Sequence, residues 1–268
     1  MASIAPAPVA PIVAQIAEAR RKRRIAYTLI FAATWLIIIG ALIGAIVATG
    51  NWSLDFTTTW APYILGGVGY TIFICVASII LATILAVLGA LGRLSTNPVV
   101  NGIASLYVSI VRGTPLLVQI YFIFFALPAL GIVLDPVPAG IIALGFNYGA
   151  YMTEIFRAGI QAVPKGQREA AQALGMPERL VMRRIVLPQA IRIVIPAIGN
   201  DFISMIKDSA LVSIVSLQEV LWRANKVGRS NFQTIQALVI AAAIYWALTI
   251  IFSFFQERLE RRLARSDR

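Results

Sequence analysis

Long apolar segments alternate along the chain with short stretches rich in charge, glycine and proline. A helix needs about 20 residues to cross the roughly 30 Å hydrocarbon core of a bilayer, and most of the apolar segments approach or exceed that length. The sequence therefore predicts an all-α, polytopic membrane protein with about six transmembrane helices. The predicted spans are residues 25–47, 64–91, 115–130, 137–156, 190–217 and 232–255.

Two of these spans carry interruptions. Residues 101–111 predict an interfacial helix that breaks at Arg112-Gly113-Thr114-Pro115, because glycine and proline interrupt helices, before the third span begins. Within residues 190–217, Lys207-Asp208-Ser209 separates two apolar runs. Ionisable residues at that depth are costly unless they face a wet cavity or one another, so they mark a candidate pathway. Residues 51–62 are expected to form an outer connection.

The connection after the fourth span is polar and contains the stretch EAAQALGMPERLVMRRIVLP, residues 169–188. It predicts two short helices, the first closed by Gly175 and the second opened by Pro177 and stopped by Pro188. Isolated helices of this length are marginal in water. We therefore expect this stretch to be held by a docking surface.

Composition and charge agree with a membrane protein. Of the 268 residues, 59% are hydrophobic and 13% are charged, and the net charge is +11. The basic residues gather at the ends of apolar segments instead of forming one continuous face, which argues against nucleic-acid binding. Their excess at residues 20–24, in the connection 158–188 and after residue 257 predicts that both termini are cytoplasmic.

One connection departs from the rule that basic residues gather on the cytoplasmic side of the membrane. Residues 218–231 should lie outside, yet they carry Arg223, Lys226 and Arg229 against Glu219 alone. The alternative is that residues 190–217 do not cross, but it would move the arginine-rich C-terminus outside. Six spans with both termini inside fit the charges better.

The sequence offers no catalytic or metal site. It has no histidine, and its single cysteine, Cys75, lies in an apolar run and is expected to pack as a small hydrophobe. A phosphate-binding G-x-x-x-x-G-K-[ST] loop is missing, since Gly66-Gly67-Val68-Gly69 begins an apolar span. The chain is therefore predicted not to be an enzyme. If nucleotide hydrolysis drives it, another subunit performs the reaction.

The spacing of residues in the polar connection matches the pattern of one protein family. It follows the pattern EAA, three residues, G, nine residues, I-x-L-P, and so resembles the EAA loop of ATP-binding-cassette importer permeases. The resemblance extends over about residues 63–262. Residues 112–119, 154–159 and 207–211 are similar to the branch that imports polar amino acids of the histidine, glutamine, glutamate and arginine type. The residues that match the loop pattern are Glu169, Ala170, Ala171, Gly175, Ile185, Leu187 and Pro188.

This resemblance implies a type I importer permease fold in a prokaryotic cytoplasmic (inner) membrane. The EAA loop would couple to separate ATPase subunits, which use ATP and Mg²⁺, whereas this chain would bind no cofactor. A second permease chain, identical or a paralogue, and an extracytoplasmic binding protein are the other implied partners. The implied organisation is a tail (1–24), an additional span (25–47), a permease domain (63–256) with its coupling loop (158–188), and a C-terminal tail (257–268).

Candidates for contact with the polar amino acid are the charged and amide side chains of the interrupted segments. Arg112 could instead extend to lipid headgroups, and Glu154 could pair with Arg157 on the same helix. The four candidates in residues 200–208 could stabilise a helix break. A competing function is an ion-coupled transporter or channel that needs no ATPase partner. The candidates are Arg112, Gln119, Glu154, Asn200, Asp201, Lys207 and Asp208.

Overall fold

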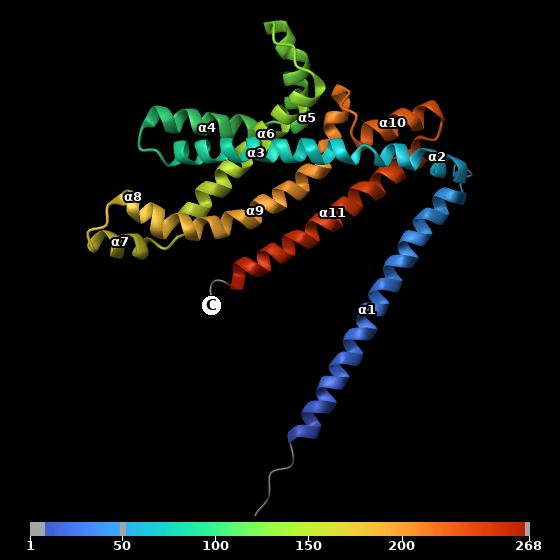
Figure 1. Ribbon diagram of the computed structural model, residues 1–268, viewed down its shortest axis with the longest axis horizontal. Coiled ribbons are helices and arrows are strands. Elements are labelled where there is room, and N and C mark those ends of the chain that lie inside the picture. The colour runs from blue at the N-terminus through green and yellow to red at the C-terminus, as the bar shows by residue number, and fades with distance from the viewer. Residues whose placement is uncertain (1–8, 49–51, 266–268) are drawn as a thin grey trace, which may run out of the picture. The chain divides into compact units, whose positions relative to one another are not determined.

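The computed structural model describes residues 9–48 and 52–265, which are helical for most of their length and contain no strand (Figure 1). The outermost parts of the predicted tails 1–24 and 257–268 lie outside the described residues. Two compact units divide the chain, one ending at Ser53 and the other beginning at Leu54. The all-α fold class is thereby confirmed.

The first unit contains one helix, α1 (Val9–Ala48). Its apolar part confirms a helix over the predicted span, although the helix already begins before the basic cluster 20–24. Large apolar side chains are exposed along it, and Tyr27, Phe31 and Trp35 stack one turn apart. Such a helix is suited to a hydrocarbon environment, because most of its described apolar side chains are exposed.

The second unit is built around two long helices that pack against each other, α3 (Val68–Leu94) and α6 (Pro136–Gln161) (Figure 1). Close approach between them depends on glycine. A Cβ atom at Gly145 would lie 2.7 Å from the side chain of Leu81, and one at Gly149 would lie 2.9 Å from that of Leu85. These contacts explain why the fourth predicted span carries glycines four residues apart.

The other elements of this unit follow in chain order around that pair. They are α2 (Leu54–Leu65), α4 (Pro98–Gly113), α5 (Leu116–Tyr121), η1 (Phe122–Ala126), η2 (Leu127–Leu130), α7 (Lys165–Ala173), α8 (Glu178–Val181), η3 (Met182–Val186), α9 (Leu187–Asp208), η4 (Ser209–Val215), α10 (Val220–Ser230) and α11 (Thr234–Arg265).

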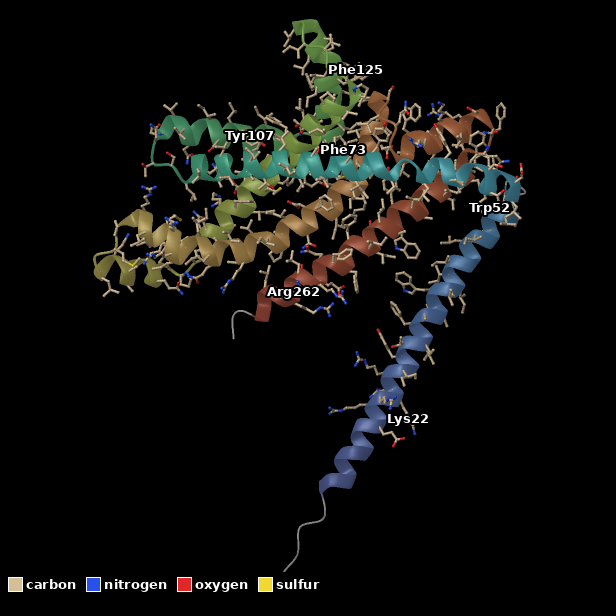
Figure 2. The ribbon with its side chains drawn as sticks, viewed as in Figure 1. Lys22, Trp52, Phe73, Tyr107, Phe125 and Arg262 are labelled. Carbon is tan, nitrogen blue, oxygen red and sulfur yellow. The ribbon has the colours of Figure 1, made fainter. Side chains whose placement is uncertain are left out.

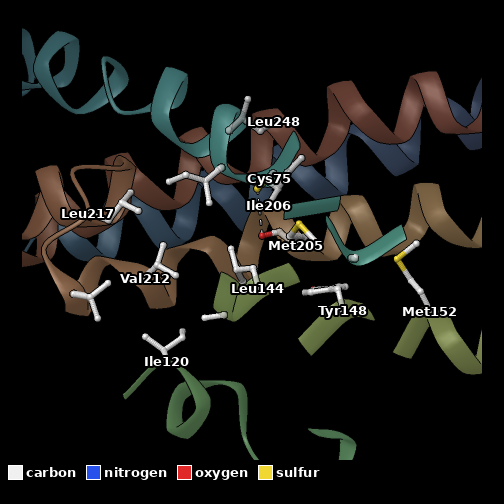
Figure 3. Packing of buried hydrophobic residues seen from close by; sticks show 14 of the residues in the cluster. Cys75, Ile120, Leu144, Tyr148, Met152, Met205, Ile206, Val212, Leu217 and Leu248 are labelled. Carbon is white, nitrogen blue, oxygen red and sulfur yellow. Dashed lines mark hydrogen bonds between the residues drawn. The ribbon is translucent and has the colours of Figure 1, made fainter. Parts of the chain in front are cut away.

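The core lies where α3, α6 and α9 meet. Cys75 is buried, as predicted, and its thiol donates to the carbonyl of Met205 at 3.6 Å (Figure 3). Leu144, Tyr148 and Met152, which are spaced by one turn, present one face of α6 to this cluster.

Two features of the secondary structure were not expected from the sequence. Helix α2 occupies most of residues 51–62, which were predicted to form an outer connection. Asp55 lies in its first turn, where a carboxylate favours a helix, and Phe56 and Ile64 are buried beneath it. Helical residues with a buried face can therefore look like a polar connection in the sequence.

Pro188 does not stop a helix either. The five-residue π-helical turn η3 precedes α9, and the N–H of Leu187 donates to the carbonyl of Met182, five residues earlier. Pro188 then occupies the first turn of α9, where its missing N–H costs little. The widened turn lets the chain continue as a helix through the proline.

The predicted interruptions are both present. The bent pair formed by residues 98–113 and 116–130 turns by 108°. Likewise α9 ends at Asp208 and continues as the 3₁₀-helix η4. Among the described residues, three helical stretches are long and apolar enough to span a membrane, or four with the bent pair. The count of six spans stays a prediction.

Candidate translocation site

A polar pocket opens between the bend after α4, helix α6 and helix α9, and we call it the α6–α9 pocket. Its volume is about 310 Å³, which is within the range of small-molecule sites. All three walls come from interrupted or polar stretches of apolar helices. The lining residues are Thr114, Pro115, Leu116, Asn147, Tyr148, Tyr151, Asp201, Ser204 and Asp208.

The bend forms the first wall. Thr114 has extended backbone angles, as expected before a proline, and Pro115 begins the next helix. A bend leaves backbone carbonyls without helical partners, and Gln119 satisfies two of them. Its amide Nε2 donates to the carbonyls of Val111 at 2.8 Å and Thr114 at 3.1 Å, while its Oε1 accepts from Asn147 at 3.1 Å. The observed contacts of Gln119 thus stabilise the break.

The acidic wall is provided by α9. Asp201 and Asp208 lie seven residues apart, so both face the same side of the helix. The hydroxyl of Tyr148 donates to Oδ2 of Asp208 at 2.8 Å. Oδ2 of Asp201 is buried and has no hydrogen-bond partner in the described part of the chain. A buried carboxylate oxygen without a donor is costly, so this wall is suited to a ligand that brings an N–H donor or a positive charge.

A cation stands at the edge of the same pocket. The guanidinium of Arg112 lies 5.2 Å from the ring centroid of Tyr151, which lines the pocket. This contact is a cation–π interaction and holds an exposed arginine beside the opening. The pocket therefore presents carboxylates inside and a guanidinium near its rim, a pair of environments that fits the two charges of an amino acid.

Glu154 lies elsewhere, in an ion-pair cluster that ties α3 to α6. Its Oε1 is 3.1 Å from Nε of Arg93, and its Oε2 is 2.7 Å from Nη2 of Arg157. The structure thus supports the pairing with Arg157 that the sequence left open, and Glu154 does not line the α6–α9 pocket. Asn200 and Lys207 are exposed and do not line it either.

The sequence missed several pocket residues that carry no charge. Tyr148 and Asn147 are adjacent polar residues within the apolar span that became α6, and that position alone was a usable signal. Thr114 belongs to a break that was predicted, but its role in a pocket was not. Ser204 follows Asp201 by three residues and could have been found from its helical face.

The polar connection that resembles an EAA loop forms a second, separate feature. Gly175 has φ of +78°, a left-handed conformation that glycine adopts freely, and the N–H of Met176 donates to the carbonyl of Ala171 at 3.1 Å across the turn. This closure of the first helix at Gly175 confirms that prediction. Ala171 is buried with Val181 and Val186, so one face of α7 is fixed from below.

The opposite face of α7 is uncovered, and we call it the α7–α8 surface. Glu169 and Ala170 are exposed, and Leu174 is 84% exposed. The chain itself thus provides the predicted docking surface only for the face of α7 that carries Ala171. A fixed helix that presents a carboxylate and an exposed leucine is suited to contact with another protein.

Comparison with known proteins places these features in a family. Residues 79–265 match the model described as binding-protein-dependent transport system inner membrane component. The L-cystine transport system permease protein TcyB of Bacillus subtilis is 43% identical over 80% of this chain and 92% of its own length. The arginine transport system permease protein ArtQ of Bacillus subtilis is 40% identical over 80% of this chain and its own full length.

Solved structures agree with the sequence relatives. The crystal structure of an amino acid ABC transporter with histidines is 36% identical, covers 79% of this chain and 100% of its own, and has a TM-score of 0.75. The inward-facing MetNI methionine ABC transporter is 17% identical with a TM-score of 0.58 over 79% of this chain and 99% of its own, and shows the shared fold. Such relatives are transport components of the inner membrane, with the ATPase on a separate subunit, and not enzymes. The chain belongs to the family of binding-protein-dependent transport system inner membrane components.

Proposed function

We propose that this chain is the permease of an ATP-driven importer whose α6–α9 pocket receives a polar amino acid through its positively charged group. The observation that carries this proposal is the acidic wall of α9, where Oδ2 of Asp201 is buried without a partner. An ammonium or guanidinium group in the pocket would offset the negative charge of this wall and could donate to Asp208. Charge-assisted hydrogen bonds of this kind are about twice as strong as neutral ones.

The position of Asp208 supports the same conclusion. Tyr148 already donates to one of its oxygens at 2.8 Å, so the carboxylate is held in place while its other oxygen can accept from a ligand. Arg112 at the rim would meet the substrate carboxylate. Relatives named for cystine and arginine transport agree with an amino acid but do not specify which one this chain carries.

Energy would enter at the α7–α8 surface. In this proposal Glu169 and Leu174 contact an ATPase subunit, which uses ATP and Mg²⁺, while Ala171 anchors the helix to the permease. One such surface per chain implies two permease chains, identical or paralogous, for two ATPase subunits. An extracytoplasmic binding protein would deliver the substrate, and both termini would lie in the cytoplasm.

The family disfavours the ion-coupled transporter or channel as an alternative. An uptake assay tests the proposed pocket directly. The permease, its ATPase and its binding protein are reconstituted in liposomes, and uptake of labelled amino acids is compared between the wild type and Asp201→Asn. Uptake should fall in the variant while basal ATPase activity is kept. Unchanged uptake for every transported amino acid would contradict the proposed pocket.

A further inference from the structure

An apolar groove runs between α9 and α11, on a different face of α9 from the α6–α9 pocket. Its volume is about 330 Å³, and Ile195, Ile198 and Phe202 line it from α9. Phe252, Phe255 and Leu259 line it from α11. At 100° per residue, Phe202 and Ile195 lie about 120° and about 140° around the helix from Asp208, and the groove shares no lining residue with the α6–α9 pocket. The groove, which we call the α9–α11 groove, is therefore separate from the proposed substrate path.

Helices α9 and α11, which form the two walls of the groove, pack closely at Gln256. The amide of Gln256 donates to the carbonyl of Pro196 at 2.7 Å and to Oε1 of Glu260 at 2.9 Å. A Cβ atom at Gly199 would lie 1.7 Å from Oε1 of Gln256, so glycine at this position leaves room for the Gln256 amide between the two helices. The polar amide in the groove is satisfied by these bonds, and the remaining surface is apolar. The surface that the groove presents is therefore mostly apolar.

Arginines follow the apolar positions at one end of this groove. Arg192 precedes Ile195 by three residues on α9, and Arg262 follows Leu259 by three residues on α11, so each continues the face that lines the groove. Both side chains are exposed. Arg262 lies near the C-terminal end of α11 (Figure 2). Because α9 starts directly after η3, this is the end of the groove nearer the α7–α8 surface.

We propose that the α9–α11 groove binds one anionic phospholipid of the leaflet on the α7–α8 side. An acyl chain lies along Ile198, Phe202 and Phe255, and the guanidinium groups of Arg192 and Arg262 bind the phosphate. Guanidinium matches phosphate geometry, and basic pockets between transmembrane helices are a known setting for anionic headgroups. The charge at one end and the apolar length of the groove together favour a lipid over a peptide.

Native mass spectrometry of the purified permease–ATPase complex tests this proposal. The probes are phosphatidylglycerol, which is anionic, and phosphatidylcholine, which is zwitterionic. Each basic residue near a headgroup contributes about fivefold to binding, so Arg192→Gln with Arg262→Gln should weaken phosphatidylglycerol binding about 25-fold. Binding of phosphatidylcholine should change much less.

A matched control separates site binding from general charge. The double variant Arg229→Gln with Arg261→Gln removes the same charge at other positions, since Arg229 lies on α10 and Arg261 pairs with Glu257 at 2.9 Å. It should retain phosphatidylglycerol binding. Equal loss in both double variants, or no loss in either, would overturn the proposal.

A second variant tests the apolar part of the groove. Leu259 is 39% exposed, so Leu259→Trp can fill the groove without entering the core. Bound phosphatidylglycerol should then fall while the arginines remain. If Leu259→Trp leaves lipid binding intact but dissociates paired permease chains, the groove is covered by a second copy and the proposal is wrong.

Discussion

In the α6–α9 pocket, Asp201 and Asp208 are partly buried carboxylates that face a small cavity, and an oxygen of Asp201 lacks any partner in the described part of the chain. On the α7–α8 surface, the carboxylate of Glu169 is exposed to solvent. A buried unsatisfied oxygen is costly and can be satisfied by a small ligand, whereas an exposed carboxylate on a fixed helix costs little. Burial therefore distinguishes the proposed substrate pocket from the proposed ATPase contact.

The two regions also differ in how they are held. Helix breaks, at Thr114–Pro115 and at Asp208, shape the pocket, so its polar groups depend on side chains such as Gln119. The α7–α8 surface instead depends on a backbone turn at Gly175 and on buried Ala171. Variants in the two regions should consequently fail in different ways.

The largest expected effect is at the α7–α8 surface. Gly175→Asp replaces a glycine at φ of +78° and adds a negative charge between Glu169 and Glu178, so the ATPase subunit should be lost or released from the complex. We expect at least a tenfold fall in ATPase that co-purifies with the permease. Glu257→Lys, a charge change at an exposed position of α11, is the control and should retain it. Retention of the ATPase by Gly175→Asp would contradict the proposal that the α7–α8 surface, unlike the pocket, contacts the ATPase.

The next effect concerns the pocket. Asp201→Asn removes a buried charge, so transport should fall about 10- to 100-fold, as expected for a lost charge-assisted hydrogen bond. The same variant should unfold at an equal or higher temperature, since the unpaired carboxylate is costly. Uptake and thermal unfolding of one preparation measure both changes. A large loss of thermal stability would show that Asp201 is a structural residue.

A smaller effect is expected where glycine permits close packing outside both regions. A Cβ atom at Gly67 would lie 2.6 Å from the backbone N of Val220, so Gly67→Ala should destabilise the protein by about 1–3 kcal/mol. Gly69 has nothing within 4 Å of its Cβ position, so Gly69→Ala is the matched control and should be nearly neutral. Thermal unfolding of both variants measures the difference. Equal stability of the two would show that α10 moves away from the α2–α3 junction.

The last expected effect is a pH dependence at Glu219, in the connection between η4 and α10. Burial raises the pKa of this carboxyl to about 7, although hydrogen bonds from Tyr245 and from the N–H of Trp222 oppose that shift. A raised pKa favours the folded state at low pH, and this contribution is lost as pH rises from about 4.5 through 7. The unfolding temperature should therefore fall slightly over that range, and Glu219→Gln should reduce the fall. A steeper fall in the variant would contradict this.

The sequence predicts best what depends on local backbone chemistry. The closure at Gly175, the break at Thr114–Pro115 and the end of α9 near Lys207 all follow from glycine, proline or charge placed in an apolar stretch. The wrong prediction that Pro188 stops a helix also came from local backbone chemistry. A π-helical turn absorbs that proline, and the spacing of the sequence does not reveal such a turn.

Contacts between helices were harder to predict. Glu154 was a candidate for substrate contact, but Arg93 approaches it from another helix, and that pairing cannot be read from one stretch of sequence. Tyr148 was overlooked because its partner Asp208 lies 60 residues away. Charged and amide side chains were chosen as candidates by residue type, whereas residues line the pocket according to the helix face on which they lie.

The central claim is that ATP drives transport through the α7–α8 surface. The most direct measurement is ATP-dependent uptake of a labelled amino acid by proteoliposomes that contain permease, ATPase and binding protein, compared between the wild type and Glu169→Lys. The account predicts uptake that requires ATP in the wild type, and loss of that uptake in a variant that still inserts in the membrane. Uptake that persists without ATP, or that Glu169→Lys leaves unchanged, would contradict it.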